Sequence, residues 1–295
     1  MYHAQGESVC QGNPRRAGES GQLDASIGVA DMMDNVVTLP TQRVTKEGRS
    51  NTEAMVAKEF PLTIILNNQE LVTLLCSPTN LDYLAVGFLF AEGLINGKDE
   101  IKKITVDDRR GVARVETKEG IEPPHELLFK RLITSACGRG AAFYSSADAQ
   151  HPTKVESPIV ISTHHVFSLM EEFTQRSEVF KATGGVHSAA LCDTQSILVF
   201  NEDIGRHNAI DKIFGECVLK DISTDERLII TSGRISSEIL LKVARRNIPI
   251  IVSKSAPTDL GVKLANDLGI TLLGFARGKR VNAYTNDWRI AHDGK

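Results

Sequence analysis

The strongest constraint on the fold is a regular alternation of strand-like and helix-like segments in the second half of the chain. Short apolar runs such as "RLIITSG" and "IPIIVSK" are separated by segments such as "SSEILLKVARRN", in which apolar residues recur at helical spacing. Strands that alternate with helices form a largely parallel sheet with helices on its faces. The sequence therefore predicts an α/β fold in which residues 158–290 form a three-layer α/β/α domain.

The first half of the chain has a different pattern. "PLTIILNN" and "ELVTLLCS" are two β-type runs joined by an Asn-Asn-Gln turn, which predicts a hairpin, and a segment with helical spacing follows at "LDYLAVGFLFAEGLI". We expect a smaller N-terminal α+β domain of mainly antiparallel strands over residues 55–157. Residues 1–54 are rich in Gly, Ser, Asp and Arg, a composition that predicts a disordered tail.

Composition narrows the class of protein. Of the 295 residues, 41% are hydrophobic and 24% charged, which is typical of a folded chain, and the net charge of -3 argues against general nucleic-acid binding. No apolar run is long enough to cross a bilayer, and the N-terminus lacks the pattern of a secretory signal. The five cysteines form no CxxC pair, which fits a reducing compartment. We expect a soluble, cytoplasmic protein without membrane association.

Basic and hydroxyl side chains follow four of the predicted strands, in "NEDIGRHN", "TSGRISSE", "SKSAPTD" and "ARGKR". Ligands of α/β sheets bind beyond the carboxyl ends of the strands, where backbone N–H groups and helix dipoles favour anions. Turn and cap chemistry explains the Gly and Ser residues but not the Arg and Lys residues, so the four loops together indicate a site for a phosphate-bearing ligand. No specific nucleotide fingerprint is present. The candidate residues are Arg206, His207, Ser232, Arg234, Lys254, Ser255, Thr258, Arg277, Lys279 and Arg280.

Two other groups of residues are interpreted as structural. His187 enters a predicted strand, and its setting lacks the HxE and PCxxC motifs of zinc deaminases, so no metal site is expected. His164 and His165 open a predicted helix. The remaining cysteines of the folded region lie at buried positions of predicted strands and a helix: Cys76, Cys192 and Cys217.

Cys137 differs because it lies in the glycine-rich stretch "TSACGRG", with Arg139 two positions on. Glycines permit close approach by a partner, and a neighbouring cation favours the thiolate. The residues alone leave open whether Cys137 is a reactive sulfur or a small buried side chain. A further alternative is a cysteine hydrolase that pairs Cys137 with His207 and Asp211, which requires these groups within hydrogen-bond reach.

Several of these stretches together resemble one protein family. "ITSACGRG", "GGVHSAAL", "EDIGRHNAIDKIFG" and the long stretch from "TSGRISSE" to "LLGFARG" are similar, in the same order, to the FdhD family, the sulfur-carrier proteins that formate dehydrogenase needs to become active. The resemblance covers about residues 55–290. It implies a homodimer whose second domain resembles the cytidine-deaminase fold.

The resemblance also implies the chemistry. Cys137 would receive sulfur from a cysteine desulfurase as a persulfide and pass it to the molybdenum cofactor, a bis(molybdopterin guanine dinucleotide), before insertion into formate dehydrogenase. The chain would thus be a carrier-type sulfurtransferase. The family's C-terminal cofactor-binding stretch falls on Phe275, Ala276, Arg277, Gly278, Lys279 and Arg280.

One position departs from the family pattern. Many members carry a second cysteine three residues after the first, whereas this chain has Gly140 there. A relay through a CxxC pair is therefore impossible. Either Cys137 works alone, or the chain is a non-catalytic chaperone that binds the molybdenum cofactor for formate dehydrogenase.

Overall fold

The computed structural model describes residues 33–118, the backbone of 133–135, and residues 154–291. Its C-terminal half contains a six-stranded sheet in the order β10-β9-β11-β12-β13-β14. β11, β12 and β13 run parallel, and the other pairings are antiparallel. β11 and β12 are buried along their whole length, as expected for strands covered on both faces. The strands are β9 (His187–Cys192), β10 (Ile197–Asp203), β11 (Leu228–Thr231), β12 (Ile250–Ser253), β13 (Thr271–Arg277) and β14 (Arg280–Thr285).

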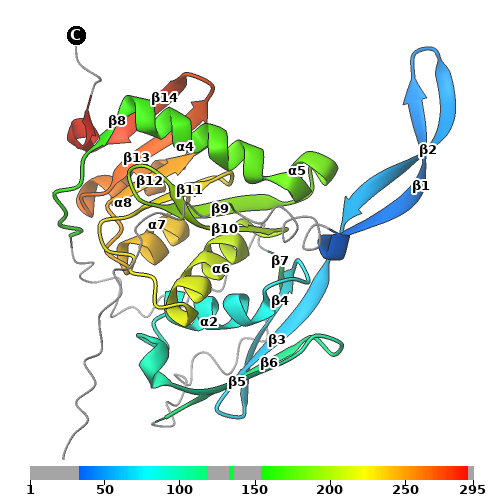
Figure 1. The fold of residues 1–295 in the computed structure, drawn as a ribbon, viewed down its shortest axis with the longest axis horizontal. Helices are drawn as coiled ribbons and strands as arrows, with labels where there is room; N and C mark the ends of the chain where they lie inside the picture. The colour runs from blue at the N-terminus through cyan, green and yellow to red at the C-terminus, as the bar shows by residue number, and fades with distance from the viewer. Residues whose placement is uncertain (1–32, 119–132, 136–153, 292–295) are drawn as a thin grey trace, which may run out of the picture.

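Helices cover both faces of this sheet, which confirms the predicted α/β/α layers (Figure 1). On one face, α4 packs Leu169 and Phe173 against a cluster that contains Ile230. On the other face, the adjacent residue Ile229 joins the cluster of α6, α7 and α8. The likeness to the cytidine-deaminase fold stays a prediction. The helices are α4 (Thr163–Arg176), α5 (Glu178–Thr183), α6 (Arg206–Leu219), α7 (Ser237–Ala244) and α8 (Asp259–Asp267).

The N-terminal half forms a second, five-stranded sheet in the order β5-β6-β3-β4-β7. The predicted β3–β4 hairpin is confirmed, and Asn67 and Asn68 adopt the positive φ angles that its tight turn requires. The sheet is mixed rather than mainly antiparallel, because β3 pairs with β6, and β4 with β7, in parallel. Its elements are β3 (Phe60–Leu66), β4 (Gln69–Cys76), α2 (Leu81–Ala91), the 3-10 helix η1 (Lys98–Glu100), β5 (Ile101–Asp107), β6 (Val112–Thr117) and β7 (Ile133–Ser135).

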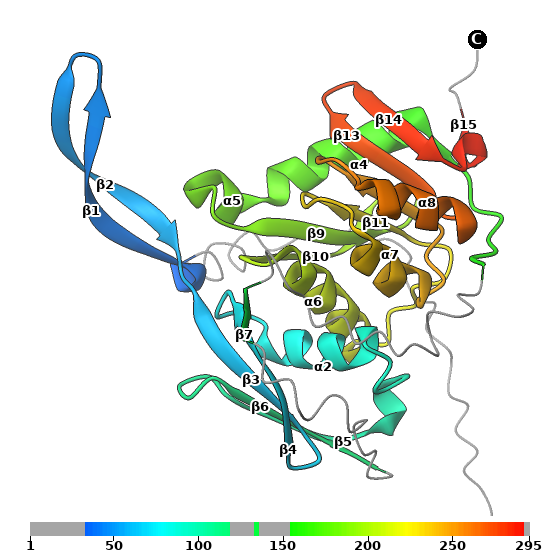
Figure 2. The ribbon, with the colours of Figure 1, turned by 180° about the vertical axis from the view of Figure 1, so that it is seen from behind.

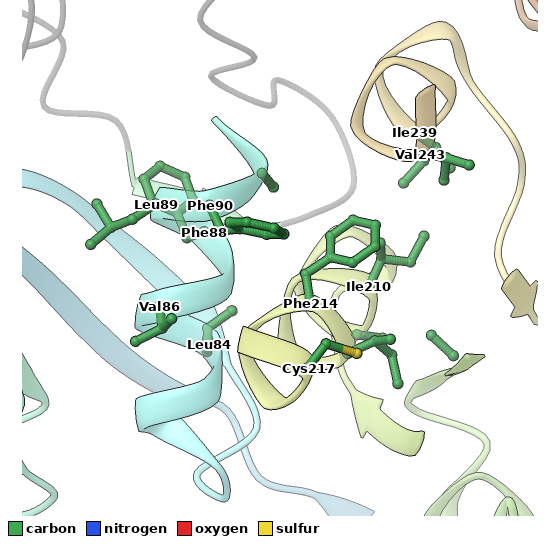
Figure 3. Packing of buried hydrophobic residues seen from close by; sticks show 14 of the residues in the cluster. Leu84, Val86, Phe88, Leu89, Phe90, Ile210, Phe214, Cys217, Ile239 and Val243 are labelled. Carbon is green, nitrogen blue, oxygen red and sulfur yellow. The ribbon is translucent and has the colours of Figure 1, made fainter. Parts of the chain in front are cut away.

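The two sheets are joined where α2 crosses α6 (Figure 3). A Cβ atom on Gly87 would lie 1.7 Å from the Asp211 carbonyl oxygen, and one on Gly215 would lie 1.8 Å from that of Tyr83. Glycine at both positions therefore lets the two helix backbones touch. Around this contact Phe90 and Phe214 meet edge to face, and both belong to a single apolar core shared by the two halves of the chain.

Residues expected to form part of the tail are instead ordered as a long hairpin. β1 (Val36–Thr45) pairs with β2 (Gly48–Ala57) along its whole length, and the arm projects away from the body of the protein (Figures 1 and 2). The tail prediction was therefore wrong for residues 36–54, and residues 1–32 lie outside the described part. The hairpin buries so few side chains that its composition resembles that of a tail; at its base, Val36 packs against Val179 and Val186.

The last described segment pairs with the strand that precedes α4. The 3-10 helix η2 (Asp287–Arg289) leads to β15 (Ile290–Ala291), which pairs in parallel with β8 (Ile161–Ser162). In the residues that the structure describes, no helix is both long and apolar enough to cross a membrane.

Candidate functional site

The strand ends that carry the predicted loops lie along one edge of the C-terminal sheet. β11, β12 and β13 are parallel neighbours, so their carboxyl ends at Thr231, Ser253 and Arg277 come out on the same side. β10 runs in the same direction and ends at Asp203. The four loops therefore lie along one edge of the sheet, although the turn after β13 leads into β14 rather than into a helix.

A groove of about 1060 Å³ lies between this edge and α4. One wall comes from the ends of β12 and β13, and the other comes from residues of α4 at helical spacing. The lining residues are Thr163, His164, Phe167, Ser168, Met170, Glu171, Thr174, Gln175, Lys181, Lys254, Ala276, Arg277, Gly278 and Lys279.

Four cationic side chains line the groove beside one carboxylate, that of Glu171; the cations are Lys181, Lys254, Arg277 and Lys279. Lys254 Nζ donates to Thr174 Oγ1 at 3.1 Å, and Arg277 Nε donates to the Lys254 carbonyl oxygen at 3.0 Å, so both cations are held in place. Burial, with the neighbouring charges of Arg277 and Lys181, lowers the pKa of the Lys254 ammonium. No carboxylate in the described ranges forms an ion pair with Lys254, Arg277 or Lys279. Such a cluster of cations suits an anionic ligand.

The groove is shaped by an irregular end of β13. Phe275 has a φ of 53°, which is unusual for a bulky residue, and its N–H donates to the Ser255 carbonyl oxygen at 3.0 Å. The register of β13 against β14 shifts between Gly274 and Arg277, so Arg277 leaves the regular ladder. Gly278, with a φ of 55°, then makes the tight turn. Strain at Phe275 thus accompanies the exposure of Arg277.

The predicted ligand residues divide into two groups. Lys254, Ala276, Arg277, Gly278 and Lys279 line the groove. Outside the groove lining lie Phe275, Arg280, Arg206, His207, Ser232 and Arg234, as do Ser255 and Thr258.

His207 and Ser232 make contacts within the fold. His207 Nε2 lies 3.4 Å from Glu238 Oε2 and connects α6 to α7; burial, with the charges of Lys242 and Arg206, lowers its imidazole pKa to about 3. Ser232 Oγ accepts from the Ser188 N–H at 3.0 Å and lies 3.3 Å from His187 Nδ1. His207 is therefore neutral at pH 7, and both side chains support the loops.

Asp203 also has an internal role. Its carboxylate accepts from the N–H groups of Ser77 and Gly205 and from Asn208 Nδ2, and it lies 2.8 Å from Lys212 Nζ. Asn208 donates in addition to the carbonyl oxygen of Leu75, at 2.9 Å. This network ties the start of α6 to the end of β4.

The Asp203 network lies where the segment that contains Cys137 leaves the described structure. Leu75 of β4 pairs with Ser135, the last residue of β7. Cys137 follows two positions later in the sequence and, with Arg139 and Gly140, lies outside the described residues. The strand that leads to Cys137 therefore ends next to the Asp203 network.

The three described cysteines are poor candidates for sulfur chemistry. Cys76, Cys192 and Cys217 are buried, which confirms that they belong to the core. Burial raises the thiol pKa of Cys76, with a smaller effect of Asp203, and that of Cys217, each to about 12; burial likewise raises the pKa of Cys192. A neutral, inaccessible thiol is a weak nucleophile.

The structure argues against the cysteine-hydrolase alternative. Asp211 accepts two hydrogen bonds from Lys242 Nζ, at 2.8 and 2.7 Å. The carboxylate that lies beside the His207 ring is that of Glu238. The His207–Asp211 pair that a triad requires is therefore not formed.

The sequence does not predict the α4 wall of the groove: it suggests a structural role for His164, whereas the structure places His164 in the groove lining. The signal was present, because His164, Ser168, Glu171 and Gln175 recur at the spacing of one helix face. That face lies beside the apolar stripe that anchors α4 to the sheet, so amphipathicity alone did not distinguish it from a solvated surface.

Comparisons with known proteins agree on one family. The family model described as "FdhD/NarQ family" matches residues 57–291. The chain is 44% identical over 241 residues to the sulfur carrier protein FdhD of Bacillus subtilis, which covers 82% of this chain and 92% of the relative. It is 43% identical to the protein of the same name from Staphylococcus aureus, with 81% and 91% covered.

A solved structure has the same fold. The crystal structure of a formate dehydrogenase accessory protein from Desulfotalea psychrophila matches with a TM-score of 0.71 and 28% sequence identity. The match covers 87% of this chain and 99% of that one.

Proposed function

The chain belongs to the FdhD/NarQ family, and from this membership we propose that it is a sulfur carrier in the maturation of formate dehydrogenase. Cys137 accepts sulfur from a cysteine desulfurase as a persulfide and passes it to the molybdenum cofactor, a bis(molybdopterin guanine dinucleotide), before that cofactor enters formate dehydrogenase. The observation that carries the proposal is the 44% identity to a protein named sulfur carrier protein FdhD, over 92% of that protein's length.

The acceptance of sulfur by Cys137 balances without an external oxidant. The Cys137 thiolate attacks the outer sulfur of the desulfurase persulfide; one S–S bond forms as the other breaks, and the desulfurase cysteine leaves as a thiolate. The choice of Cys137 is supported by the burial of Cys76, Cys192 and Cys217, which removes them as acceptors. Thiolate chemistry of this kind belongs in a reducing compartment, so the expected location is the cytoplasm.

The groove beside α4 is the proposed site for the cofactor as substrate. Lys254, Arg277 and Lys279 would hold its pyrophosphate groups through charge-assisted hydrogen bonds. The open volume of about 1060 Å³ and the apolar side chains of Phe167 and Met170 leave room for a ring system beside the phosphates. Among the residues implied by resemblance, those that line this groove are the better candidates.

A second function is favoured by one observation. Gly140 occupies the position at which many relatives carry a second cysteine, so a two-cysteine relay is not available. The chain would then be a chaperone that binds the molybdenum cofactor for formate dehydrogenase without carrying sulfur.

Mass spectrometry after incubation with a cysteine desulfurase and cysteine distinguishes the two functions. A sulfur carrier gains one reducible sulfur atom on the Cys137 peptide, and Cys137→Ala abolishes the gain, whereas Cys10→Ala retains it. If an active desulfurase transfers no sulfur to Cys137, the carrier function is rejected. A chaperone further predicts that Cys137→Ala still supports formate dehydrogenase activity in cells.

A further inference from the structure

A second pocket, with a volume of about 450 Å³, lies between the start of α2 and the end of β5. Its apolar lining consists of Leu81, which is buried, and of Pro78, Ile104 and Val106, which are partly buried. The pocket shares no lining residue with the groove beside α4. The proposed cofactor site therefore does not account for it.

Both ionisable side chains in the lining of this pocket are carboxylates. Asp82 lies in the first turn of α2, and Asp108 lies in the turn that follows β5. Neither carboxylate forms an ion pair within the part of the chain that the structure describes. Apolar contact beside two carboxylates suits arginine, whose side chain joins an apolar stem to a cationic fork.

The N-terminal segment, residues 1–32, joins the described structure beside this pocket. Residues 33–35 form a helical turn at the base of the β1–β2 arm (Figure 1). The buried Asn35 donates from Nδ2 to Thr79 Oγ1 at 2.9 Å, and Thr79 Oγ1 donates to Asn35 Oδ1 at 3.1 Å. Thr79 stands between Pro78 and Asn80, and both of these residues line the pocket.

The N-terminal segment carries its basic residues in one place. Arg15 and Arg16 are the only Lys or Arg residues among residues 1–32, and 16 residues, 17–32, join Arg16 to Met33. An extended chain spans about 3.3 Å per residue, so the pocket is well within reach of this arginine pair. Because the segment is tethered, its effective concentration at the pocket is high, which favours the contact without any further interaction.

We propose that the segment around Arg15 and Arg16 binds in this pocket of its own chain. The two guanidinium groups pair with Asp82 and Asp108, and the apolar stems cover the apolar lining. The matching family model begins at residue 57, so the bound segment belongs to a part of the chain outside the match. The inference is independent of the sulfur-carrier proposal.

The pocket adjoins the loop that anchors the Asp203 network. Ser77 lies in this loop, two positions before Thr79; its N–H donates to Asp203 Oδ2 at 3.0 Å, and its hydroxyl accepts from the Ile204 N–H at 3.2 Å. The strand that leads to Cys137 ends next to the same network. Binding in the pocket therefore connects the N-terminal segment to the region from which the Cys137 segment extends.

Limited proteolysis of the full chain with trypsin tests the proposal. Trypsin cleaves after arginine and lysine, so residues 1–32 offer it only Arg15 and Arg16. A bound segment is cleaved only once it is released, and the cleavage rate, followed by intact-protein mass spectrometry, reports the released fraction. Combining Asp82→Asn with Asp108→Asn is expected to raise this rate at least about fivefold.

Asp107→Asn is the matched control, because it neutralises the adjacent aspartate, which lies outside the pocket lining. It is expected to leave the cleavage rate unchanged. A wild type cleaved as fast as the double variant would overturn the proposal, as would a control cleaved as fast as the double variant. Protection that increases with protein concentration would also overturn it, because the pocket would then hold a segment of another molecule.

A cross-linking measurement identifies the contact without removing a carboxylate. In the variant Arg16→Lys, a carbodiimide joins the amine at position 16 to a carboxylate that it touches, and peptide mass spectrometry locates the bond. The expected product joins position 16 to Asp82 or Asp108. If neither aspartate is joined to position 16, the proposal is rejected.

Discussion

Lys212 Nζ lies 2.8 Å from Asp203 Oδ2, and neither side chain is exposed to solvent. The pair is placed between α6 and the end of β4, so it connects the two sheets at the point where the strand toward Cys137 ends. Removing one partner of a buried pair leaves an uncompensated charge, which is far more costly than the loss of a surface pair.

We therefore expect Asp203→Ala to lower the free energy of unfolding by about 3–5 kcal/mol, as measured by urea denaturation. Lys98→Ala is the control, because it removes the largely exposed pair with Asp221 and should cost at most about 1 kcal/mol. Equal stability of the two variants would show that the Asp203 network does not hold the sheets together.

At the crossing of α2 and α6, a glycine-to-alanine substitution is expected to lower the stability of the protein rather than raise it. Gly→Ala inside a helix normally stabilises it by about 1 kcal/mol. At Gly215 the added methyl group would lie 1.8 Å from the Tyr83 carbonyl oxygen, so the helices must separate. We expect Gly215→Ala to destabilise the protein by about 3 kcal/mol or more in urea denaturation.

Gly185→Ala is the control for this substitution, because its methyl group would meet the Ala57 side chain at 3.2 Å rather than a helix backbone. A stabilising effect of Gly215→Ala would mean that α2 and α6 do not touch at this point.

The neutral state of His207 predicts a loss of stability in acid. Burial lowers its pKa to about 3, whereas the pKa of an unfolded histidine is about 6.5. Below pH 6.5 the imidazole is therefore protonated in the unfolded state but stays neutral in the folded state. The free energy of unfolding falls as the pH falls. Between pH 7 and pH 5.5 this single group should cost about 1 kcal/mol.

Urea denaturation at the two pH values measures the effect, and His207→Gln should reduce the loss by that amount. If the variant loses as much stability as the wild type over the same interval, the imidazole is not held neutral by its surroundings.

The groove predicts a difference between two neighbouring arginines. Arg277 lines the groove and is held by the Lys254 carbonyl oxygen, whereas Arg280 begins β14 outside it. With guanosine diphosphate as the probe, we expect Arg277→Gln to weaken binding at least about tenfold by isothermal titration calorimetry, since a charged hydrogen bond contributes about 1.5–3 kcal/mol. Arg280→Gln should change the affinity little. Equal losses would place the phosphates elsewhere.

What local sequence predicts in this chain is the type and order of most elements. Apolar periodicity located the strands of the C-terminal sheet, and the basic residues after them located the edge at which Lys254 and Arg277 meet. Both follow from residues adjacent in the chain.

What local sequence did not predict depends on partners distant in the chain. The parallel pairing of β3 with β6 forms across two intervening strands, β4 and β5, and the helix α2. The groove wall of α4 is recognisable only once the helix is placed over β13. The β1–β2 arm was missed because its strands are exposed on both faces, so the apolar alternation that marks a half-buried strand is weak.

The shared core has a consequence for synthesis on the ribosome. Leu84 and Phe90 of α2 join the same apolar cluster as Phe214 of α6, and nearly half of the chain separates them in sequence. Because chains emerge from the N-terminus, α2 leaves the ribosome long before the helix that will cover it has been made. The apolar face of α2 therefore stays uncovered until α6 (Arg206–Leu219) has also been made, and during that interval it can bind chaperones that recognise exposed apolar surface.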